Sequence, residues 1–291
     1  MHKGVVSNRA LYELLCRGAS GEVMAVFSSA VYFKLSGKTC MLHDKAYGTI
    51  PFGISLPDIN GNARNLGLEP GMKLRAEGGY FSSEAAFQMQ ISYKQSLTHP
   101  AKLSQLRSFT EKAESVLRDT QRSELRVYCA GNIAEVDKSK IEDIFAKTAY
   151  TGLLELEQAM LENKPEAIEN ALQKLIGLGR GLTPSLDDFL CGLVFVLLYA
   201  AREWHCSIPS LSALVDGIRT IAPRQTNEYS MAYLLSAAAG EDFSLMRECL
   251  ENSGSDEAHK SIEALLMVGA SSGADMLSGM CFASNYILKQ R

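Results

Sequence analysis

The chain has 291 residues, of which 46% are apolar and 21% are charged, and its formal net charge at pH 7 is −4. This length suffices for two domains and a substantial core. The acidic balance argues against a nucleic-acid-binding face, which needs clustered basic residues, but it leaves room for a small local anion site.

The first third of the sequence carries strand signals, from residue 20 to residue 95. Segments such as GEVMAVFSSAVYFKL and AAFQMQISY are rich in Val, Phe and Tyr, and clusters of Gly, Pro and Asn separate them. This pattern predicts five to seven strands in a small barrel or sandwich. A short helix is predicted before them, at about residues 7–17.

The pattern becomes helical after His99-Pro100. The segment LSQLRSFTEKAESVLRD has apolar residues at helical spacing. From residue 137 onward only helices are predicted, over 137–149, 151–162, 165–176, 185–203, 209–221, 227–239, 242–252, 256–268 and 272–289. Strands and helices do not alternate, so a doubly wound sheet is not expected. The predicted class is α+β, with a β-rich N-terminal domain at 1–98 and a mainly helical domain at 99–291.

Several simple features bear on the compartment. The longest apolar run, 189–201, is shorter than the roughly 20 residues of a membrane span, and it predicts a buried core helix. The N-terminal stretch MHKGVVSNRALYELL lacks the apolar region of a signal peptide. The seven cysteines show no CxxC spacing and predict reduced thiols. We therefore expect a cytoplasmic protein that does not contact membranes.

The most distinctive stretch is GLGRGLTPSLDD, residues 177–188, which lies directly before the apolar run. Its glycines permit tight backbone turns, Pro184 suits a helix start, and Ser185 three residues before Asp188 has the form of a capping box. Amide groups at a helix start favour an anion. The candidate binding residues in this stretch are Gly179, Arg180, Gly181, Thr183 and Ser185.

The adjacent acids Asp187 and Asp188 have two interpretations, because carboxylates repel a bare phosphate. They could hold Mg²⁺ that bridges to a phosphate, or they could bond the backbone and hydroxyls of a neighbouring loop. A well-capped helix start without a ligand is the alternative to both. The stretch has neither the GKS or GKT of a Walker A loop nor the leading strand of a Rossmann fingerprint.

An internal repeat connects this helix start with a second one. Residues 185–192 and residues 272–279 both read S-x-x-D-φ-L-x-G, where φ is apolar, and each follows a glycine-bearing loop. The repeat suggests that the two helix starts face each other, with each aspartate ordering the other loop. The glycines inside the helices, Gly192 and Gly279, predict close helix–helix approach. Ser271, Ser272 and Asp275 join the candidate site residues.

A third polar stretch is PRQTNEYS, residues 223–230, which is predicted to open another helix. Arg224 before Thr226 and Asn227 could bind a carboxylate or phosphate, and Ser230 lies on the same helix face as Asn227. An ordinary helix cap beside a solvated arginine is the alternative.

The three motifs GLGRGLTPSLDDFLCGL, RQTNEYSMAYLLSAAAG and VGASSGADMLSGM, in this order, resemble the AllH-type subunit of oxamate carbamoyltransferase. The resemblance is specific over residues 177–288, although Leu186 stands where the family usually has glycine. It implies a role in allantoin degradation, in which carbamoyl phosphate and oxamate interconvert with oxalurate and phosphate. It also implies work with other subunits.

The main hypothesis is therefore a carbamoyltransferase subunit that binds a small anionic metabolite where the helix starts converge. Its predicted catalytic residues are Asp187, Asp188, Ser272 and Asp275. Its predicted binding residues are Gly179, Arg180, Gly181, Thr183, Ser185, Arg224, Thr226, Asn227, Ser230 and Ser271. The alternatives are a non-catalytic assembly or metabolite-binding subunit and a hydrolase that uses Mg²⁺ at Asp187 and Asp188. Other subunits or further copies of the chain are the expected partners, and nucleic acid is not.

Overall fold

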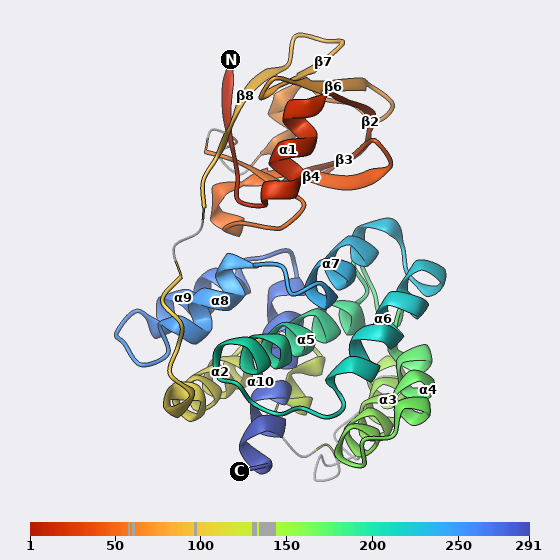
Figure 1. Ribbon diagram of the computed structural model, residues 1–291, viewed down its shortest axis with the longest axis vertical. Helices are drawn as coiled ribbons and strands as arrows, with labels where there is room; N and C mark the ends of the chain where they lie inside the picture. Colours follow the sequence, from red (N-terminus) through yellow and green to blue (C-terminus); the bar gives the residue numbers. More distant parts are fainter. Residues whose placement is uncertain (58, 60–61, 96–97, 130–132, 134–143) are drawn as a thin grey trace. The chain divides into compact units, whose positions relative to one another are not determined.

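A computed structural model describes the chain from residue 1 to residue 291, apart from 58, 60–61, 96–97, 130–132 and 134–143. It divides into two compact units, which we call the barrel unit and the helical unit (Figure 1). The barrel unit comprises Met1–Thr98 and Glu241–Leu245, and the helical unit comprises His99–Gly240 and Met246–Arg291. Glu241–Leu245 lies in the part of the sequence that we assigned to the helical domain.

The barrel unit is a closed eight-stranded barrel with the strand order β1-β5-β4-β3-β2-β6-β7-β8. Neighbouring strands are antiparallel except β4 with β5 and β1 with β8, which are parallel. The barrel confirms the α+β class, but the described residues form eight strands where we predicted five to seven. The strands are β1 (His2–Val6), β2 (Ala19–Val26), β3 (Ala30–Leu35), β4 (Lys38–Asp44), β5 (Gly53–Leu56), β6 (Lys73–Glu77), β7 (Tyr80–Ser83) and β8 (Gln88–Tyr93).

Alternate strand residues fill the barrel, because successive side chains of a strand point to opposite faces of the sheet. Phe33, Leu42 and Phe81 belong to this interior core and are almost fully buried. Helix α1 (Arg9–Arg17) contributes Leu15 to the same core. Asn8 caps that helix, since its side-chain oxygen accepts a hydrogen bond of 2.9 Å from the amide of Leu11.

His43 of β4 is a buried polar residue of the barrel unit, next to the core residue Leu42. Its Nδ1 lies 2.9 Å from the carbonyl oxygen of Asp44, and its Nε2 makes no hydrogen bond with the described residues. Burial lowers the pKa of the His43 imidazole to about 4. The folded protein therefore holds this ring neutral at pH 7.

We predict that His43 makes the barrel sensitive to acid. The unfolded chain binds a proton at this ring near pH 6.5, whereas the folded chain binds it near pH 4. Stability is therefore complete above about pH 6.5 and falls by about 3 kcal/mol as the pH drops to about 4. Urea unfolding at a series of pH values should show this loss in the wild type and less of it in His43→Leu. His259→Gln, at an exposed histidine, should keep the wild-type dependence; an unchanged dependence in His43→Leu would contradict the assignment.

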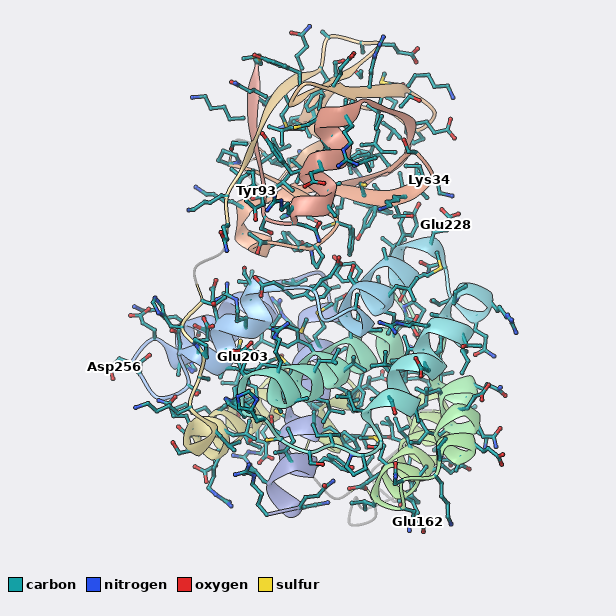
Figure 2. All side chains as sticks on the ribbon, in the orientation of Figure 1. Lys34, Tyr93, Glu162, Glu203, Glu228 and Asp256 are labelled. Atoms are coloured by element: carbon teal, nitrogen blue, oxygen red, sulfur yellow. The ribbon has the colours of Figure 1, made fainter. Side chains whose placement is uncertain are left out.

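The helical unit is built around two almost completely buried helices, α5 and α10, and α7 packs on α5 while α2 and α9 pack on α10 (Figure 1). Charged side chains such as Glu162 and Asp256 project outward from the unit (Figure 2). None of the helices in the described ranges combines the length and the apolarity of a membrane span. The helices are α2 (Leu106–Asp119), α3 (Ile144–Leu161), α4 (Pro165–Leu175), α5 (Ser185–Glu203), α6 (Leu211–Gln225), α7 (Glu228–Ala238), α8 (Ser244–Glu251), α9 (Ala258–Leu266) and α10 (Ser272–Lys289).

Two predicted helix boundaries are wrong. A single helix, α3, replaces the two predicted over 137–149 and 151–162, of which residues 137–143 lie outside the described residues. Gly152 lies within α3 and does not break it. This glycine lets Leu175 of α4 approach closely, since a Cβ there would lie 2.6 Å from the Leu175 side chain. Helix α6 was predicted to end at residue 221, but it continues through Pro223 to Gln225. Proline has no amide hydrogen, so the helix forgoes one hydrogen bond at this position.

Helices α5 and α10 approach each other through the glycines of the internal repeat. A Cβ on Gly192 would lie 2.0 Å from the carbonyl oxygen of Met276, and a Cβ on Gly279 would lie 1.9 Å from that of Phe189. Thr183, just before α5, lies beside Ser272 at the start of α10, and residues after the end of α5 line one cavity with the end of α10. The two helices therefore run in the same direction, and their N-termini are neighbours. The predicted close approach at Gly192 and Gly279 is confirmed.

We predict that Gly279→Ala lowers the free energy of unfolding, because the new methyl group meets rigid backbone. Overpacking of this kind costs about 1–3 kcal/mol, and the better helix propensity of alanine returns up to about 1 kcal/mol. Gly217→Ala in α6 is the matched control, since its Cβ would meet only the end of the Leu172 side chain. Urea unfolding should show a larger loss for Gly279→Ala. An equal or smaller loss would contradict the backbone contact.

Candidate functional site

The starts of α5, α7 and α10 lie together in the helical unit, and hydrogen bonds join them. Thr183, in the loop before α5, lies 3.0 Å from the hydroxyl of Ser272 at the start of α10. Thr226, just before α7, donates to the carboxyl of Asp187 in α5. We call Asp187, Asp188 and Asp275, with the side chains that bond them, the carboxyl cluster.

Asp187 joins the glycine-rich loop and the start of α7 to α5. Its Oδ1 accepts a hydrogen bond of 2.8 Å from the amide of Gly177, and its Oδ2 accepts bonds from the hydroxyls of Thr226 and Ser230, the latter at 2.7 Å. Both oxygens are therefore occupied by protein donors. Gly177 adopts a φ of +81°, which glycine tolerates far better than other residues.

Asp188 bonds the loop before its own helix and the start of α10. Its Oδ2 accepts a hydrogen bond of 2.8 Å from Thr183, and the hydroxyl of Ser272 faces the same carboxyl and lowers its pKa. Asp275 has the reciprocal arrangement, because the hydroxyl of Ser185 at the start of α5 faces its carboxyl. Each aspartate of the repeat thus orders the other helix start, which confirms the prediction from the internal repeat.

Ser185 and Asp188 do not form the capping box that their spacing predicts. Helix α5 begins at Ser185, Pro184 occupies the cap position, and no side chain there bonds the first turn. The Ser185 hydroxyl is directed to Asp275 instead, since the parallel neighbour α10 offers a buried carboxyl. The serine of each helix start therefore faces the aspartate of the other helix.

Ser123 also bonds the carboxyl cluster, and no pattern in the sequence predicted it. Its hydroxyl donates to Oδ1 of Asp275. The residue lies between α2 and the short 3₁₀ helix Leu125–Tyr128, in a stretch that carries no motif. Only the folded packing of α2 against α10 brings it to the site.

The amides at these helix starts are largely used within the protein. In α5, Leu186 donates to the carbonyl of Leu178 at 3.1 Å. In α10, Gly273 donates to the carbonyl of Val268 at 2.9 Å. Tyr229 and Ser230 of α7 both donate to the side chain of Asn227. An anion at this place would therefore rely on the remaining amides, the hydroxyls and Arg180.

The predicted site residues divide by exposure. Asp187, Asp188, Ser230 and Asp275 are buried, whereas Arg180, Gly181 and Asn227 are exposed, and Gly179, Thr183, Ser185, Thr226, Ser271 and Ser272 are half-buried. Arg224 is exposed in the last turn of α6, where a cation interacts favourably with the helix dipole. It also precedes Thr226 and the Asn227 cap of α7.

The three carboxyls of the cluster have perturbed pKa values. Burial raises the pKa of Asp187, although bonds from Thr226, Gly177 and Ser230 oppose this. Burial raises the pKa of Asp188 well above its usual value, and the charge of Asp275 adds to the effect. Burial raises the pKa of Asp275 to about 6. The cluster therefore concentrates carboxyl groups where a negative charge is poorly solvated.

A cavity elsewhere in the helical unit does not include these motifs. It has a volume of about 280 Å³, lies at the C-terminal ends of α5 and α10, and is lined by Cys206, Ser207, Ile208, Tyr286, Ile287, Gln290 and Arg291. The described part of the chain contains no group of three or more His, Cys, Asp or Glu residues placed to hold a metal ion. The carboxyl cluster is thus the arrangement on which all three motifs converge.

These features define an α+β protein whose helical unit is organised by two parallel, carboxyl-linked helix starts. Residues 175–284 match the family model described as oxamate carbamoyltransferase subunit AllH. The resemblance drawn from the three motifs is therefore confirmed over this segment, and the match supports a subunit associated with a carbamoyltransferase. No solved structure matches the chain.

We predict that Asp187 is required for stability. Asp187→Ala would leave the Gly177 amide and the hydroxyls of Thr226 and Ser230 without their acceptor, at a cost of about 2–4 kcal/mol. Urea unfolding followed by circular dichroism measures the loss. Asp216→Ala, at an exposed aspartate in α6, should change stability by less than about 0.5 kcal/mol. Similar small effects of both variants would show that the Asp187 network contributes little.

Proposed function

We propose that this chain is a cytoplasmic subunit of an oxamate carbamoyltransferase that, with partner subunits, transfers the carbamoyl group between carbamoyl phosphate and oxamate in allantoin degradation. The observation that carries the proposal is the coincidence of the family match over residues 175–284 with the carboxyl cluster. Of the residues whose side chains bond the cluster, only Ser123 lies outside the matched segment.

The exposed loop 179–183 is the surface that we assign to the phosphate group of carbamoyl phosphate. Arg180 offers a planar set of donors suited to phosphate, and it lies in the exposed part of this loop. The two parallel helix dipoles add positive potential at their common end. Carbamoyl phosphate is already activated, so positioning and charge stabilisation could supply most of the rate without a covalent nucleophile.

In this proposal the buried aspartates position the loop and do not touch the substrate. Asp188 holds Thr183, and Asp187 holds Gly177, so the two carboxyls fix both ends of the loop. We therefore assign Asp187, Asp188 and Asp275 to positioning. Ser272, the fourth predicted catalytic residue, is exposed enough to reach a ligand.

A non-catalytic role in assembly or metabolite binding is the second candidate. It is favoured by the internal use of the helix-start amides, because those of Leu186 and Gly273 already donate to protein carbonyls. In that case the cluster would stabilise a surface for the partner subunits, and the partners would hold the reacting groups.

We predict that Arg180→Ala raises the KM for carbamoyl phosphate about 10-fold or more in the complex reconstituted with its partner subunits, because a charge-assisted hydrogen bond contributes about 1.5–3 kcal/mol. Release of phosphate in the presence of oxamate measures the reaction. Arg9→Ala, at an exposed arginine of the barrel unit, is the control and should leave KM unchanged.

The outcome separates the two candidates. Unchanged kinetics in Arg180→Ala, with complex assembly intact, would refute the role of the loop in phosphate binding. A thermal shift of the isolated chain with carbamoyl phosphate supports the first candidate. Stability that responds only to the partner subunits supports the second.

A further inference from the structure

Two carboxyl oxygens of the cluster have no hydrogen-bond partner among the described residues, although both are inaccessible to solvent. They are Oδ1 of Asp188 and Oδ2 of Asp275, and each residue is only 1% exposed. A buried ionised oxygen without a partner is costly. Asp187 differs, because protein donors occupy both of its oxygens.

The two unpartnered oxygens occupy equivalent positions of the internal repeat. Asp188 is the fourth residue of α5 and Asp275 is the fourth residue of α10, and the helices run parallel with their starts adjacent. Thr183 bonds both Asp188 and Ser272, the first residue of α10, and so places the Asp188 carboxyl at the start of that helix. A single guest between the two helix starts could therefore satisfy both oxygens.

No lysine or arginine is among the described groups that most affect the pKa values of Asp187, Asp188 and Asp275. Those groups are hydroxyls, one amide and other acids. Each helix N-terminus supplies only about half an elementary charge. Three carboxyls therefore share one buried region with two helix N-termini.

The available ligands are all hard oxygens. Besides the two carboxyl oxygens, the hydroxyls of Ser185 and Ser271 face Asp275, and that of Ser272 faces Asp188. Hard divalent cations such as Mg²⁺ and Ca²⁺ prefer oxygen ligands of this kind, whereas zinc prefers nitrogen and sulfur.

We propose that Asp188 Oδ1 and Asp275 Oδ2 together hold one hard divalent cation, of the Mg²⁺ or Ca²⁺ class, between the starts of α5 and α10. This site pairs Asp188 with Asp275 across the two helices. The sequence suggested the adjacent pair Asp187 and Asp188, but Asp187 has no oxygen free to take part. The cation would link the two helix starts and is independent of any carbamoyl chemistry.

The test is a titration of the full-length chain, stripped with EDTA, with Mg²⁺ or Ca²⁺ at constant ionic strength. A ligand that binds only the folded state raises stability with its concentration, so the wild type should show a rising Tm. Isothermal titration should give one ion per chain. Asp188→Asn and Asp275→Asn should each weaken binding by at least about 10-fold, since a neutral amide oxygen is a poorer ligand for a divalent cation.

Asp187→Asn is the matched control, because it alters the neighbouring carboxyl without touching either proposed ligand. It should lower the Tm at every cation concentration and keep the cation-dependent rise. If an asparagine variant fails to fold, the metal content of the wild-type chain before EDTA treatment gives a second measurement, with one Mg²⁺ or Ca²⁺ expected per chain.

Two results would overturn the proposal: no Tm rise in the wild type up to about 10 mM of either ion, or a rise that persists unchanged in both Asp188→Asn and Asp275→Asn. Protons rather than a cation would then neutralise the pair. Because Tm and binding are measured on the isolated chain, either result leaves the carbamoyl transfer assay of the reconstituted complex to be judged separately.

Discussion

The structure of the helical unit depends on the parallel pairing of α5 and α10. Parallel helices place two positive dipole ends side by side, which is unfavourable unless negative charge lies between them. Asp188 and Asp275 lie at these two ends, and the carboxyl of each faces a hydroxyl of the opposite helix start. Gly192 and Gly279 permit the backbones to come close enough for these bonds to form. The S-x-x-D-φ-L-x-G repeat therefore encodes one interaction, made twice.

These contacts between the two helix starts explain why the polar residues before the apolar run exceed what one helix start needs. Some of these residues contact α10, and others hold the loop itself. Asp187 bonds Gly177 at one end of the loop, and Asp188 bonds Thr183 at the other. The segment between them remains at the surface, with Arg180 exposed. A loop that is held at both ends and exposed at its centre is suited to binding a small ligand. For this reason we assign ligand binding to the loop and not to the buried acids.

The sequence predicted those features that depend on local pattern. The alternation of Val, Phe and Tyr segments with turns indicated a β-rich first unit, and the repeated motif indicated that two helix starts face each other. Features that depend on distant packing were not predictable. Ser123 bonds Asp275 across 152 positions of sequence without any motif. Helix α6 was predicted to end at residue 221, before Pro223, but it continues to Gln225, although proline removes one helical hydrogen bond there.

The unpartnered oxygens raise the question of why the chain has aspartate at both positions. If hydroxyl binding were the only requirement, asparagine would accept the same bonds with its side-chain oxygen and carry no buried charge. A buried carboxyl is costly when one oxygen lacks a partner, and here the cost arises twice, at equivalent sites of one helix pair. Hydroxyl binding therefore does not account for aspartate at both positions. The proposed cation, shared by both carboxyls, would supply the missing partner at both positions at once.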